Sequence, residues 1–161
     1  MEIIENRVVE ELIKRNYKIS TAESCTGGLL SATLINVPDA SKIIDMSFVT
    51  YSNQAKIDLV NVSPITLERY GAVSEQTAIE MARGTAKKSN ANVGLSTSGI
   101  AGPGGGTATK PVGMVCFGIY INGKEYTYTN IFKNMQRNEV RMESVKFILC
   151  KLYELLIEEN L

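Results

Sequence analysis

The most informative absence in this chain of 161 residues is histidine, which it does not contain. Without an imidazole, the chain by itself cannot form a Ser/His/Asp or Cys/His catalytic unit, and it cannot build a metal site that needs histidine. Acid–base chemistry near neutral pH would therefore need another group whose pKa has been moved toward neutrality.

Cysteine and long hydrophobic runs are scarce as well. The three cysteines Cys25, Cys116 and Cys150 lie far apart with no CxxC spacing, so we expect neither a disulfide framework nor a thiolate metal site. Nowhere do eighteen apolar residues run together, and the N-terminal segment is rich in glutamate. These features predict a cytoplasmic protein that does not act at a membrane.

An excess of charge of either sign is also missing. Seventeen Lys and Arg residues balance seventeen Asp and Glu residues, and no basic tract is present, so we expect no nucleic-acid partner. The length and a hydrophobic content of 44% indicate one globular domain over residues 1–161.

Helical and strand patterns alternate along the chain, which predicts a single three-layer α/β/α domain. Its sheet should be mixed and mostly parallel, with an antiparallel hairpin in the C-terminal half that turns at Asn122-Gly123 in a type I′ turn. The predicted strands are 17–23, 45–52, 93–98, 112–121 and 125–132. The predicted helices are 2–15, 29–35, 53–60, 64–70, a segment that starts at 75, and 137–159.

The segment 21–28, TAESCTGG, places small and hydroxyl residues in a turn between a strand and a helix. Ser24 could act there as a nucleophile, because N–H groups that open a helix can hold a developing oxyanion. The alternative is that Ser24 or Thr26 simply caps the helix, and for an isolated serine capping is the commoner role. Cys25 is a competing nucleophile, but it could equally be a small buried side chain.

A serine nucleophile needs a base, and in a chain without histidine lysine is the remaining candidate. Desolvation would lower the pKa of a lysine ammonium toward neutrality, so that the free amine could accept the serine proton. Lys56 is the candidate, because it follows Tyr51 on a probable turn at the carboxyl end of a strand. The alternative is that Lys56 is a solvated surface residue, as most lysines are.

Residues 99–106 contain five glycines and one proline, so they must form a specially shaped loop between two strands. Backbone N–H groups in such a loop can bind an anion, which suggests a phosphate; the alternative is a flexible connection. Lys110, Arg137 and Arg141 could add positive charge to a phosphate subsite, or could be surface residues.

Taken together, these segments resemble the C-terminal domain of the competence/damage-inducible CinA proteins. The matching stretches are TAESCTGG (21–28), the turn at 38–41, VTYSNQAK (49–56), GAVSE (71–75), SGIAGPGGGTATKPVG (98–113) and RNEVR (137–141). Two departures from the family pattern are Ser98, where threonine is usual, and Met135-Gln136, where Gly-Asp is usual.

The resemblance implies hydrolysis of the carboxamide of nicotinamide mononucleotide (NMN), without a metal or organic cofactor, by a homo-oligomeric protein of pyridine nucleotide salvage. It implies that Ser24 is the nucleophile, that Lys56 is the general base and that Tyr51, which lines the pocket, is the third catalytic residue. The implied or suggested substrate-binding residues are Thr26, Gly27, Gly28, Ser41, Ser98, Gly102, Gly104, Gly105 and Arg137. Two other functions stay open, namely a nucleotide-binding module without turnover and a Ser/Lys amidase for another carboxamide.

Overall fold

The computed structural model describes residues 2–159, which form six α-helices, one short 3-10 helix and five strands. The helices are α1 (Ile4–Arg15), α2 (Leu29–Ile35), η1 (Ala40–Lys42), α3 (Asn53–Val60), α4 (Pro64–Tyr70), α5 (Glu75–Lys88) and α6 (Arg137–Glu158). The strands are β1 (Ile19–Glu23), β2 (Phe48–Val49), β3 (Val93–Gly99), β4 (Met114–Ile121) and β5 (Lys124–Ile131).

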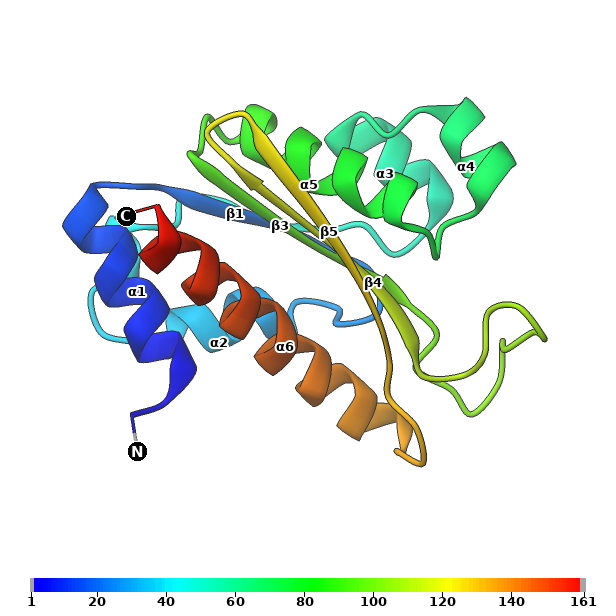
Figure 1. Cartoon of the computed structure of the whole chain (residues 1–161). Coiled ribbons are helices and arrows are strands. Elements are labelled where there is room, and N and C mark those ends of the chain that lie inside the picture. Colours follow the sequence, from blue (N-terminus) through cyan, green and yellow to red (C-terminus); the bar gives the residue numbers. More distant parts are fainter. Residues whose placement is uncertain (1, 160–161) are drawn as a thin grey trace.

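The strands form one sheet in the order β2-β1-β3-β4-β5. Helices α3, α4 and α5 cover one face of this sheet, and α1, α2 and α6 cover the other (Figure 1). The prediction of one three-layer α/β/α arrangement is confirmed. The interior strand β4 is almost wholly buried, as its apolar sequence predicted, because helices pack on both faces of the sheet.

Strand direction in the sheet is mixed. β1 pairs in parallel with β2 and β3, whereas the β3–β4 and β4–β5 pairs are antiparallel, so β4 alone runs against the other four strands of the described chain. The hairpin turn has positive φ angles at both central residues, 46° at Asn122 and 93° at Gly123, as a type I′ turn requires.

The predicted strand at 45–52 is much shorter in the structure, where only Phe48 and Val49 pair with β1. β1 itself ends at Glu23, the partner of Val49, where the chain turns at Ser24. The carbonyls of Thr50, Tyr51 and Ser52 all face the ammonium group of Lys56. The N–H group of Thr50 still donates to the carbonyl of Glu23, and beyond it the chain continues toward α3.

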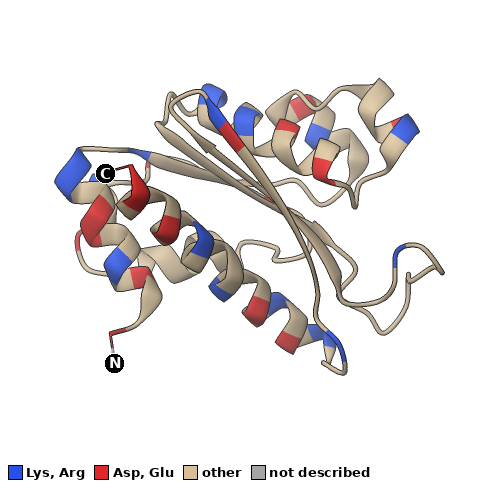
Figure 2. Cartoon of the chain, viewed as in Figure 1, with Lys and Arg blue, Asp and Glu red and all other residues tan. Residues whose placement is uncertain are grey.

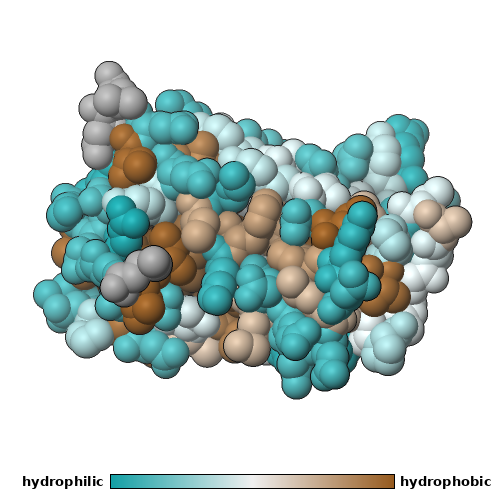
Figure 3. Space-filling model, turned by 60° about the horizontal axis from the view of Figure 1, so that its bottom comes forward, coloured by the Kyte–Doolittle hydropathy of each residue, from teal (hydrophilic) through white to brown (hydrophobic). Residues whose placement is uncertain are grey.

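The surface of the domain mixes charge and hydropathy. Lysine, arginine, aspartate and glutamate are interspersed on the helices, and most of the sheet is uncharged (Figure 2). Figure 3 brings the layer of α1, α2 and α6 forward and shows hydrophobic residues scattered among hydrophilic ones. No helix within residues 2–159 combines the length and apolar character needed to cross a membrane.

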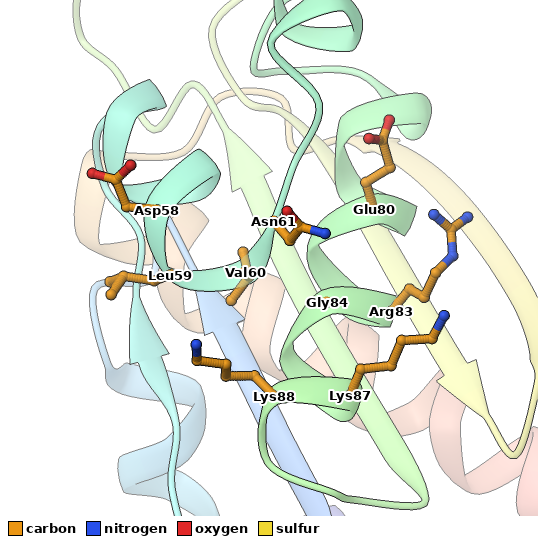
Figure 4. Close-up of a pocket in the computed structure, with 9 residues that line it drawn as sticks. All are labelled: Asp58, Leu59, Val60, Asn61, Glu80, Arg83, Gly84, Lys87 and Lys88. Atoms are coloured by element: carbon orange, nitrogen blue, oxygen red, sulfur yellow. The ribbon is translucent and has the colours of Figure 1, made fainter.

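Gly84 lets α5 approach the end of α3 closely (Figure 4), and this contact gives a prediction of stability. A Cβ atom at Gly84 would lie 1.7 Å from the carbonyl oxygen of Val60, which belongs to the backbone and cannot turn away. We expect Gly84→Ala to lower the free energy of unfolding by about 2 kcal/mol or more. The control is Gly104→Ala, where a Cβ would meet no atom within 4 Å and where thermal unfolding should shift little.

Candidate active site

Ser24 lies in the turn between β1 and α2, at the carboxyl end of a strand that is buried along its whole length. Its N–H group donates to the carbonyl of Thr97 on β3, which fixes the turn to the neighbouring parallel strand. Ligand sites of α/β domains lie at this edge of the sheet. The serine side chain is largely buried and lines a cavity of about 290 Å³.

Lys56 reaches Ser24 from α3, which begins after the N-cap Ser52 and carries the lysine on its first turn. The Nζ atom of Lys56 lies 3.3 Å from Ser24 Oγ and also donates to the carbonyls of Thr50, at 2.8 Å, and Tyr51, at 3.2 Å. The lysine side chain is 1% exposed. The hypothesis of a solvated surface lysine is therefore wrong.

No carboxylate forms an ion pair with Lys56 among the described residues. Burial therefore disfavours the positively charged form of this lysine. Burial lowers the pKa of Lys56 to about 8, from an ordinary value of 10.5. A substantial fraction of the lysine is therefore neutral near pH 8. The neutral amine has a lone pair that could accept the proton of Ser24 Oγ.

Cys25 also lines the cavity, but its chemistry is different. Burial raises the pKa of the Cys25 thiol to about 12, so the thiol stays protonated near neutral pH and is a poor nucleophile. Ser24 is the better candidate for the nucleophile at this turn.

The structure brings most of the predicted site residues into this one cavity. Its lining includes the predicted residues Ser24, Tyr51, Lys56, Ser98, Gly102, Gly104, Gly105 and Arg137. Tyr51 contributes through its backbone carbonyl, which lies 3.4 Å from Ser24 Oγ, while its phenol hydroxyl accepts from Arg137 at 3.3 Å. Arg137 also donates to the carbonyl of Gly102, so it ties the start of α6 to the glycine loop.

Four predicted binding residues do not line the cavity: Thr26, Gly27, Gly28 and Ser41. The buried hydroxyl of Thr26 donates to Glu23, and Ser41 is exposed on η1. The N–H groups of Gly27 and Gly28 already donate to the Ser24 carbonyl and to Glu23. The expectation that these two glycine N–H groups hold an oxyanion is therefore corrected, because both have acceptors inside the protein.

The acceptor for the Gly28 N–H is Glu23, a residue that the sequence motifs did not single out. Its carboxylate is fully buried under the turn and accepts from the N–H groups of Gly28, Leu30 and Ser31. The hydroxyls of Thr21 and Thr26 donate to it as well. The sequence signal for this role was a glutamate at the end of a strand whose other residues are uncharged. Glu23 thus accepts the hydrogen bonds of the N–H groups at the beginning of α2 that a ligand could otherwise accept.

Two of the cations proposed for a phosphate subsite point elsewhere. The Nζ atom of Lys110 donates to the carbonyl of Tyr70, and Lys110 lies outside the cavity lining. The guanidinium of Arg141 donates to carbonyls of the Ser24 turn. Arg137 is therefore the one of these three cations that faces the cavity.

A larger cavity, of about 550 Å³, lies between α3 and α5 and holds none of the predicted residues (Figure 4). Its charged side chains are engaged in the fold or exposed. Arg83 pairs with Glu125, Glu80 accepts from the N–H of Ser63, and Lys87 and Lys88 are exposed. The smaller cavity at Ser24 is the one that brings together a candidate nucleophile, a base and a cation.

The protein is thus a three-layer α/β domain. At the carboxyl edge of its parallel strands, a serine lies in contact with a buried lysine. The model of the CinA C-terminal domain matches residues 1–156, and the chain belongs to this family. The prediction made from the sequence motifs is confirmed.

Relatives and solved structures agree with this assignment. A protein of Clostridioides difficile (strain 630), named as a competence-damage inducible protein, is 51% identical over 149 residues, which are 92% of this chain and 35% of the relative. An Alkaliphilus metalliredigens protein with the same name is 54% identical over 75% of this chain and 29% of its own length. The chain thus spans about a third of the length of these curated relatives.

Two crystal structures have nearly the same fold. A CinA superfamily protein of Klebsiella pneumoniae superimposes with a TM-score of 0.92 at 35% identity, over 96% of each chain. The competence/damage inducible protein CihA of Agrobacterium tumefaciens superimposes with a TM-score of 0.89 at 39% identity, over 98% of this chain and 94% of the other.

Proposed function

We propose that this protein hydrolyses the carboxamide of NMN to nicotinate mononucleotide and ammonia. The observation that carries the proposal is the buried, unpaired Lys56, whose Nζ atom lies 3.3 Å from Ser24 Oγ in a cavity at the sheet edge. The choice of NMN rests on the family resemblance of the motifs. The choice of a serine–lysine mechanism rests on the residues themselves.

Hydrolysis would begin with the neutral amine of Lys56. Its two N–H groups can keep the carbonyls of Thr50 and Tyr51 as acceptors, which leaves the lone pair for Ser24 Oγ. As Ser24 Oγ forms a bond to the amide carbon, its proton moves to Lys56 Nζ and the amide oxygen becomes an oxyanion. The C–N bond then breaks, and Lys56 returns the proton to the leaving nitrogen, which departs as ammonia.

Water would complete the reaction on the acyl-enzyme. The free amine of Lys56 accepts a proton from water while the water oxygen attacks the ester carbon. The ester C–O bond breaks, Ser24 Oγ regains its proton from Lys56, and the carboxylic acid ionises as it leaves. In each half of the reaction Lys56 accepts one proton and returns it. The proton balance therefore requires no metal or organic cofactor.

The direct test is to mix purified protein with NMN and to measure ammonia by an enzyme-coupled assay, with nicotinate mononucleotide followed by chromatography. We expect both products in equal amounts. Binding of NMN without either product would instead favour the nucleotide-binding module. Turnover of another carboxamide with higher kcat/KM would favour a Ser/Lys amidase of different specificity.

The rate should depend on pH through Lys56. Only the neutral amine can act as the base, so kcat/KM should rise with pH, about tenfold per unit below the pKa, and level off above a pKa of about 8. The measurement is initial ammonia release from pH 6 to pH 10. A rate that keeps rising toward the ordinary lysine pKa of 10.5 would contradict a desolvated Lys56 as the base.

A phosphate subsite should separate NMN from nicotinamide riboside, which lacks the 5′-phosphate. Arg137 faces the cavity beside the glycine loop, whose Gly102 and Gly105 line the cavity with positive φ angles. A charge-assisted hydrogen bond of this kind contributes about 1.5–3 kcal/mol, so we expect kcat/KM to be about 10- to 100-fold lower for the riboside.

The matched variant for this prediction is Arg137→Ala. It should lower kcat/KM for NMN by a similar factor and change the value for the riboside much less, because the riboside has no phosphate to lose. Equal kcat/KM for the two substrates with the unchanged protein would refute the subsite.

A further inference from the structure

Arg141 lies on the first turn and a half of α6 and reaches the turn that carries Ser24, more than a hundred residues earlier in the chain. Its Nε atom donates to the carbonyl of Cys25 and its Nη2 atom to the carbonyl of Thr26, each at 3.0 Å. Arg141 forms no ion pair among the described residues. A planar guanidinium suits two neighbouring acceptors of this kind, which a lysine ammonium would not hold in the same geometry.

The hydrogen bonds of the N–H groups in the same turn indicate a role for this contact. From Ser24 to Ser31, six of the eight N–H groups donate to an acceptor within the protein, three of them to the Glu23 carboxylate. Only those of Cys25 and Thr26 donate to no acceptor within residues 2–159. Cys25 directly follows Ser24, the position from which a backbone N–H stabilises the oxyanion in other serine hydrolases, and it lines the cavity, whereas Thr26 is fully buried outside the cavity lining.

Arg141 holds the carbonyl side of Cys25, the residue that carries the free N–H group at the cavity. The N–H and the carbonyl of Cys25 are joined through a single Cα atom, so hydrogen bonds that hold the planar peptide groups on either side of Thr26 restrict the backbone of Cys25 and the direction of its N–H. Glu23 holds the turn from inside the domain, and Arg141 holds it through its carbonyls.

We infer that Arg141 is a positioning residue for the reaction: by holding the carbonyls of Cys25 and Thr26 it fixes the conformation of Cys25, so that the free Cys25 N–H stabilises the oxyanion formed at Ser24. The inference rests on the proposed function, since an oxyanion forms only if Ser24 attacks an acyl group. Arg141 is not assigned contact with the substrate, which distinguishes it from Arg137 at the cavity.

The test compares Arg141→Lys with the unchanged protein in amide hydrolysis. Because the lysine keeps the charge and loses the two-point contact, kcat should fall about 10- to 100-fold while KM changes less than about threefold. The kcat of Arg141→Ala should fall at least as far, and part of it should return when methylguanidinium is added. The matched control Arg83→Lys changes a half-buried arginine that is paired with Glu125 far from Ser24, and it should keep its activity.

A second readout does not depend on the natural substrate. A fluorophosphonate forms a phosphorus–oxygen bond to the serine and releases fluoride, and negative charge develops on its phosphoryl oxygen in the same place as on an amide oxygen. We expect the rate of Ser24 labelling, followed by intact-protein mass, to fall in Arg141→Lys by about the same factor as kcat. Thermal unfolding of the lysine variant should stay close to that of the unchanged protein.

The outcomes are separable. If the unchanged protein is labelled at Ser24 and releases no ammonia from NMN, the proposed function fails and the labelling rates alone decide the role of Arg141. Full labelling and full kcat in Arg141→Lys would overturn the inference, as would a loss confined to KM. A protein that neither labels nor hydrolyses the amide would overturn both proposals.

Discussion

Replacing Ser24 by alanine should abolish amide hydrolysis, with kcat lowered by at least about 10³-fold and KM changed little. The hydroxyl oxygen is the atom proposed to form the bond to the amide carbon, and alanine offers no substitute. The neighbouring thiol of Cys25 cannot replace it near neutral pH, because burial raises its pKa to about 12. The measurement is single-turnover and steady-state release of ammonia from NMN.

The Ser24→Ala variant should keep its fold, because the hydroxyl makes only a long contact of 3.4 Å to the carbonyl of Tyr51 besides its contact with Lys56. Binding of nicotinate mononucleotide should therefore persist while turnover is lost. A suitable control is Ser89→Ala, a serine at the C-cap of α5 whose hydroxyl contacts Ser20 and lies outside the cavity lining. Unchanged turnover in Ser24→Ala would show that another atom is the nucleophile.

Replacing Lys56 by arginine should lower kcat by about 10²- to 10⁴-fold, the range that general-base catalysis usually contributes. A guanidinium stays protonated at any pH at which the protein is folded, so it cannot accept the serine proton. It is also larger than the ammonium it replaces, at a position that is fully buried. The pH dependence should change together with the rate, because the inflection near pH 8 belongs to Lys56.

Lys56→Met separates the loss of the base from the effect of a larger cation. Methionine removes the buried charge and fits a similar space, so this variant should fold at least as well as Lys56→Arg and be equally inactive. Lys87→Arg, at an exposed lysine of α5, provides the matched control and should be fully active. Activity above a tenth of normal in both Lys56 variants would exclude this lysine as the base.

The element pattern could largely be predicted from the sequence, because it depends on local information. Helix α2 begins and ends where the sequence predicted, and α3 and α4 begin after the serine caps Ser52 and Ser63. The hairpin followed from Asn122-Gly123. The predicted strand at 45–52 was wrong at both ends, because its length depends on the extent of its partner β1, which ends at Glu23, and not on its own residue pattern.

For the site, the sequence alone determined which chemistry was excluded and which atoms were available. The absence of histidine left Ser24 with lysine as the most plausible base, and the motifs named Lys56 among the lysines. These conclusions need only residue types, their order and the resemblance of the motifs, so they did not require coordinates.

Only the tertiary structure decided how those atoms are arranged. Burial of Lys56 without a carboxylate lowers its pKa, and burial is a property of the packed domain. The engagement of the turn by Glu23 and Arg141 depends on where a strand end and a distant helix meet in space. Hydrogen bonds between residues far apart in the chain leave no local pattern in the sequence, and they decide which N–H groups of the turn stay free.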